Sequence, residues 1–104
     1  MSNDALLKQI SEDRKRVDLA QSVNKLNENL DFKKVIQVHL FQDRLNALAL
    51  QLSVYVKDSP EYSQIVRELD AISYLRNHLV ELKELGDEAQ AALSEAQYLI
   101  DNED

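Results

Sequence analysis

The two histidines, His39 and His78, are the side chains of this chain best suited to metal binding or acid–base chemistry. Each has one carboxylate at helical spacing, with Asp43 four residues after His39 and Glu81 three residues after His78. A zinc site needs three or four converging ligands, and the chain has no cysteine to add to either pair. We therefore expect packing roles for both histidines, with no metal centre and no bound cofactor.

The chain also lacks the sequence patterns of nucleophilic and phosphate-binding sites. None of its serines lies in a G-x-S-x-G or S-x-x-K context, and its single glycine leaves no glycine-rich loop for a phosphate. Carboxylates are abundant, but a catalytic pair needs an enclosed pocket, of which amphipathic helices give no sign. We expect the protein not to be an enzyme.

Charge is distributed unevenly along the chain. There are 12 Lys and Arg against 19 Asp and Glu, a net charge of −7. Residues 1–80 are neutral, so residues 81–104 carry all of the net negative charge. A protein that grips nucleic acid shows the opposite sign. The one basic cluster, Arg14–Arg16, is flanked by acidic residues and is typical of a solvated helix face, so direct nucleic-acid binding is not expected.

The composition predicts an all-α protein of one domain. One glycine and one proline in 104 residues are too few to turn a chain through many short strands. Apolar periodicity predicts helices over about 4–27, 32–56 and 60–102. Asn29 or Asp31 can cap the second helix, and Asp58 or Ser59 the third, with Pro60 in its first turn.

The third segment carries a seven-residue apolar repeat that passes through Gly86. One position holds Ile65, Ile72, Leu79, Gly86, Leu93 and Ile100, and its companion holds Leu75, Leu82, Ala89 and Ala96. Glycine commonly ends a helix, so a stop or bend at Gly86 is one reading. The repeat keeps its phase across this residue, however, which favours a single helix to about residue 102.

The apolar surface of the two later segments is larger than three helices can bury. The second segment has one stripe at Val38, Phe41, Leu45, Leu48, Leu52 and Tyr55, and a second at Val35 or Ile36, Leu40, Ala47, Leu50 and Val54. The third helix should extend beyond its shorter partners. We therefore expect a helical hairpin or three-helix bundle with a long C-terminal helix, coiled-coil-like and homo-oligomeric. The predicted interface consists of Leu45, Leu48, Leu52, Ile72, Leu75, Leu79, Leu82, Gly86, Ala89, Leu93, Ala96 and Ile100.

Three strings resemble small all-helical proteins of tailed bacteriophages. They are Leu30-Asp31-Phe32-Lys33-Lys34-Val35-Ile36, Leu69-Asp70-Ala71-Ile72-Ser73-Tyr74-Leu75, and Ala89 to Ala96 with Glu95. The resemblance implies a virion, head-assembly or infection accessory protein and carries no functional residues with it.

The start Met1-Ser2-Asn3-Asp4 is not a signal peptide, and no apolar run reaches about 18 residues. The expected location is the host cytoplasm or the virion, with no secretion and no membrane partner.

Two functions compete. The surplus apolar surface favours a self-associating structural or interaction protein that binds itself and another protein. The alternative is an inhibitor that occupies a basic groove on a host nucleic-acid-handling protein. It is favoured by the concentration of the net negative charge in residues 81–104.

Overall fold

The computed structural model describes residues 2–102, with side chains from residue 4, and these residues are helical except at two connections. The elements are α1 (Ser2–Glu28), α2 (Leu30–Phe32), η1 (Lys33–Arg44), α3 (Leu45–Leu52) and α4 (Pro60–Asp101). Because α2, η1 and α3 follow one another without a gap, the chain forms three helical rods. The prediction of an all-α protein with a long C-terminal helix is confirmed.

Polar caps define where the second and third rods begin. Asn29 caps α2, with its Oδ1 accepting a 2.9 Å hydrogen bond from the Phe32 amide. Ser59 caps α4, with its Oγ accepting from the Tyr62 amide at 3.2 Å. Each cap satisfies one of the amide groups that the first turn of a helix leaves without a backbone partner.

The second rod ends at Leu52, four residues before the predicted end at Val56. The Ser53 hydroxyl donates to the Leu50 carbonyl at 2.6 Å, and the chain closes into a turn at this point. Two of the next three residues are β-branched valines, which are weak helix formers. Asp58 then adopts φ 69°, in the left-handed region, before α4 starts.

The covered side of the second rod includes most of the predicted stripe. Leu48 is buried and Phe41, Leu45 and Leu52 are half-buried, whereas the two end residues, Val38 and Tyr55, are 45% and 43% exposed. Residues Lys33–Arg44 form a π-helix, whose i→i+5 hydrogen bonds widen each turn.

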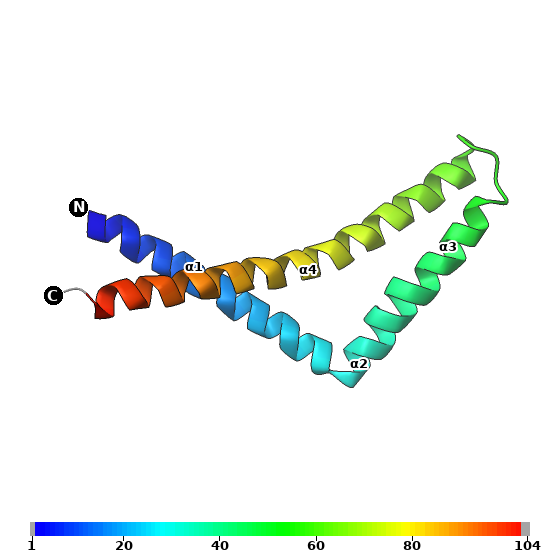
Figure 1. Cartoon of the computed structure of the whole chain (residues 1–104). Helices are drawn as coiled ribbons and strands as arrows, with labels where there is room; N and C mark the ends of the chain where they lie inside the picture. Colours follow the sequence, from blue (N-terminus) through cyan, green and yellow to red (C-terminus); the bar gives the residue numbers. More distant parts are fainter. Residues whose placement is uncertain (1, 103–104) are drawn as a thin grey trace. The chain divides into compact units, whose positions relative to one another are not determined.

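The third rod, α4, is one continuous helix that includes Gly86 (Figure 1). The helix continues because Gly86 does not adopt a positive φ, the conformation in which glycine usually ends a helix. Glycine inside a helix lowers its stability by only about 1 kcal/mol relative to alanine.

The chain divides into two compact units. The first unit joins α1 as far as Lys25 to α4 from Val80 onward, and the second spans Leu26–Leu79. Both cores are small. The buried residues of the first unit are Asp13, Ala20, Val23, Gly86 and Ala89, and those of the second are Leu48 and Ile65.

Candidate interaction surface

The first unit is built on a close approach between α1 and α4 (Figure 1). A Cβ atom placed on Gly86 would lie 2.1 Å from the Ala20 Cβ and 3.1 Å from the Arg16 carbonyl oxygen. Only glycine fits this position, because such distances are far inside van der Waals contact. Two small residues therefore let the helices meet, and the seven-residue seam of α4 faces α1 of the same chain at Gly86.

Three of the predicted interface residues are buried within the chain. Gly86 and Ala89 are buried in the first unit, and Leu48 is buried in the second. Most of the others are half-buried: Leu45, Leu52, Ile72, Leu79, Leu82, Leu93 and Ala96. Leu75 and Ile100 are exposed. The seven-residue repeat does not show that α1 covers part of this face of α4.

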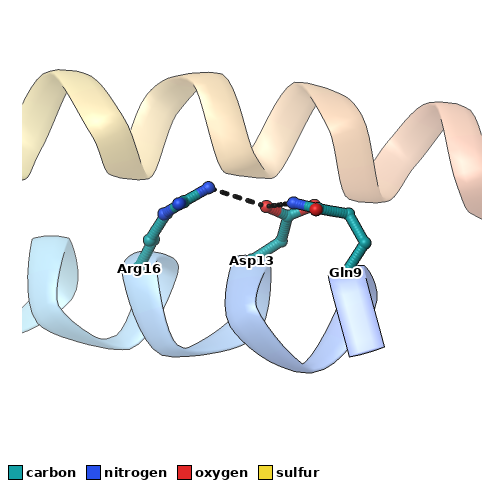
Figure 2. A network of polar contacts seen from close by, with 3 residues as sticks. All are labelled: Gln9, Asp13 and Arg16. Carbon is teal, nitrogen blue, oxygen red and sulfur yellow. Dashed lines mark hydrogen bonds and ion pairs between the residues drawn. The ribbon is translucent and has the colours of Figure 1, made fainter. Parts of the chain in front are cut away.

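A carboxylate, Asp13, lies in the α1–α4 contact and is only 4% exposed. Its Oδ1 accepts hydrogen bonds from Gln9 Nε2 at 3.0 Å and from Arg16 Nη1 at 3.4 Å. Figure 2 shows the three side chains on the side of α1 that faces α4. The ion pair between Arg16 and Asp13 is long, and the Arg16 side chain is 46% exposed, so water reaches its guanidinium group. Asp13 fills the interval between Ser11 and Arg16 where the sequence has no large apolar residue.

Replacing Asp13 with leucine is expected to stabilise the first unit by about 1–2 kcal/mol. Burial removes the hydration of the carboxylate, and an ion pair of 3.4 Å compensates for only part of this free-energy cost. A leucine would instead add buried apolar surface at the same place. The exposed Gln9 and Arg16 side chains would return to water. Urea unfolding measures the change, with Asp70→Leu at an exposed α4 position as the control. A loss of more than 1 kcal/mol would show that the polar cluster holds the helices together.

The two helices of the first unit frame an open groove of about 1060 Å³. Its α1 side presents Leu7, Ile10, Arg14 and Lys15, among others, and its α4 side presents residues from Gln90 to Asp101. A second hollow of about 340 Å³ is lined by Leu6, Leu99 and four other residues from Ala92 to Ile100. Apolar side chains thus remain accessible on more than one side of this helix pair.

The second unit has a smaller hollow, of about 400 Å³, beside its buried residues Leu48 and Ile65. Arg44 and Glu68 lie at its edge, joined by a 2.7 Å ion pair between Nη2 and Oε2. Both side chains are more than a third exposed, so the pair adds little to stability. The hollow lacks the enclosure that a catalytic pair would need.

The histidines do not form a site. His78 stacks on Tyr74, with ring centroids 6.1 Å apart, and both lie exposed on α4. His39 is exposed in η1. Among the described residues, no three His, Cys, Asp or Glu side chains gather closely enough to hold a metal ion.

Sequence reasoning missed the α1 half of the candidate surface. Leu7, Ile10 and Lys15 line the groove, and Ala20 makes the close contact, yet none was predicted as an interface residue. The sequence did contain a signal, which is a seven-residue repeat in α1. One position of the repeat holds Ile10, Val17 and Asn24, and another holds Leu6, Asp13 and Ala20. The repeat is difficult to recognise because Asp13 is polar.

The comparisons with known proteins add no family. No family model, curated protein or solved structure matches this chain. Within residues 2–102, no helix combines the length and the apolar character needed to cross a membrane.

Proposed function

We propose that this chain is a non-enzymatic, self-associating structural protein whose fold is completed by further subunits. The observation that carries the proposal is the small amount of apolar surface that each unit buries. Only Leu48 and Ile65 are buried in the second unit, while 17 large hydrophobic residues are exposed among those whose side chains the structure describes. Leu50, Val54 and Val56 are each more than 70% exposed, which is costly for a chain that stays alone in water.

The biological setting we propose is the assembly of a tailed bacteriophage particle, as a virion or head-assembly accessory protein that also binds another protein. It is supported by the resemblance of Leu30–Ile36 and Leu69–Leu75 to small phage proteins. These strings lie on α2 with η1 and on α4, and they help to form the second unit.

Sedimentation equilibrium tests self-association. We expect a mass that is a multiple of 12.0 kDa at tens of micromolar. A 12.0 kDa species at every concentration would contradict the proposal and favour the second candidate, the acidic inhibitor. The observation behind that candidate is that Glu81, Glu84, Asp87, Glu88, Glu95 and Asp101 are all exposed on α4.

A further inference from the structure

The groove between α1 and α4 is long enough for about three turns of a helix. Its lining covers residues 7–18 of α1 and 90–101 of α4, and a helical turn takes about 3.6 residues. Both walls of the groove are themselves helices of at least that length. The first unit therefore contains both a groove and the kind of element that would fill it.

Apolar side chains in this groove are only partly covered. Leu7 is 63% exposed and Ile100 is 47% exposed, while Ile10 and Leu93 are half-buried. A helix laid between the walls would cover all four. Tyr98, which is 66% exposed at the groove, offers both a ring and a hydroxyl, a combination enriched at protein interfaces.

The two walls carry opposite charges. The α1 wall is lined by two basic residues, Arg14 and Lys15, and one acidic residue, Asp18, so its net charge is positive. Among the described residues, the only charged one on the α4 wall is acidic, Asp101. In a two-fold dimer every contact occurs twice, so placing α1 of one copy on α4 of the other pairs basic with acidic residues at both places. Placing α4 on α4 would instead bring two acidic segments together. Charge complementarity thus selects one pairing of the four helices.

We propose that this groove is a homodimer interface, occupied by the first unit of a second copy with α1 of each chain packed on α4 of the other. The inference rests on the proposed function, because it names the surface and the partner of that self-association. The product is a four-helix arrangement in which Leu7, Ile10, Leu93 and Ile100 of both copies form a shared apolar core.

Reciprocal charge reversal tests the pairing. One variant carries Arg14→Glu with Lys15→Glu on the α1 wall, and the other carries Gln97→Lys with Asp101→Lys on the α4 wall. Each variant alone sets like charges against each other in its homodimer, and we expect its dissociation constant to rise at least tenfold. In a mixture of the two, both α1–α4 contacts join opposite charges, so a heterodimer with near wild-type affinity is expected.

Matched controls change the same amount of charge elsewhere. Lys33→Glu with Lys34→Glu matches the first variant, and Asn77→Lys with Glu84→Lys matches the second; all four residues are exposed and outside the groove. Both controls should dimerise like the wild type. Circular dichroism should show unchanged helicity in all variants.

The outcomes separate the two proposals. If the groove variants associate as strongly as the wild type, or if the mixture fails to form heterodimers, the groove interface is wrong while self-association stands. If the wild type itself is monomeric in sedimentation equilibrium, both proposals fail.

Discussion

Gly86→Ala is expected to lower the free energy of unfolding by about 1–3 kcal/mol, although the same change at an ordinary helix position stabilises. Alanine is favoured over glycine inside a helix by about 1 kcal/mol. Here the new Cβ would lie 2.1 Å from the Ala20 Cβ, so α1 and α4 must move apart. Their separation would weaken the packing of Val23 and Ala89, two of the five buried residues of this unit.

A double mutant isolates the contact from helix propensity. Combining Gly86→Ala with Ala20→Gly moves the methyl group from α1 to α4 and removes the shortest contact, and we expect a coupling free energy of at least about 1 kcal/mol. The double mutant should not recover the full wild-type free energy of unfolding, because the Arg16 carbonyl oxygen would lie 3.1 Å from the added Cβ atom. Ala91→Gly, at an exposed position of α4, calibrates propensity and should cost about 1 kcal/mol. Stabilisation by Gly86→Ala in urea unfolding would show that the helices do not meet here.

Leu48→Ala should have the largest effect on the second unit, a loss of about 2–5 kcal/mol. Leu48 is 1% exposed and is the most deeply buried large side chain among the described residues. Truncation removes its transfer free energy and leaves a cavity that few neighbours can fill. Because Ile65 is the other buried residue of this unit, a loss of this size removes much of its stability.

Leu50→Ala is the matched control, two residues away on the same helix and 72% exposed. It should change the free energy of unfolding by less than about 0.5 kcal/mol. Hydrogen exchange of the Ile65 amide reports whether the second unit opens. Equal effects of the two leucine substitutions would refute the assignment of Leu48 to the core.

Local chemistry made much of the fold predictable. Helix content follows from the scarcity of glycine and proline, the start of α4 from Ser59-Pro60, and the buried face of α4 from its seven-residue repeat. A repeat shows that a face is covered but not by which element. The pairing of Gly86 with Ala20 depends on two small residues 66 positions apart in the sequence, and nothing local links them.

Other features lay outside the reach of pattern reasoning for different reasons. The π-helix over Lys33–Arg44 was not predicted, because apolar spacing does not distinguish i→i+5 from i→i+4 hydrogen bonds over so short a segment. The early end at Leu52 depends on the Ser53 hydroxyl, whose hydrogen bond competes with the next helical turn. Asp13 is buried at a position where the repeat would predict an apolar residue, so the sequence did not indicate that α1 packs on α4.

The midpoint of thermal unfolding, measured over a hundredfold range of protein concentration, tests most directly whether subunits complete this fold. Association stabilises the native state by mass action, so the midpoint should rise steadily with concentration. The Arg14→Glu, Lys15→Glu variant should need at least tenfold more protein to reach the same midpoint. A wild-type midpoint that does not depend on concentration would contradict the account, because two units with such small cores would then be stable without a partner.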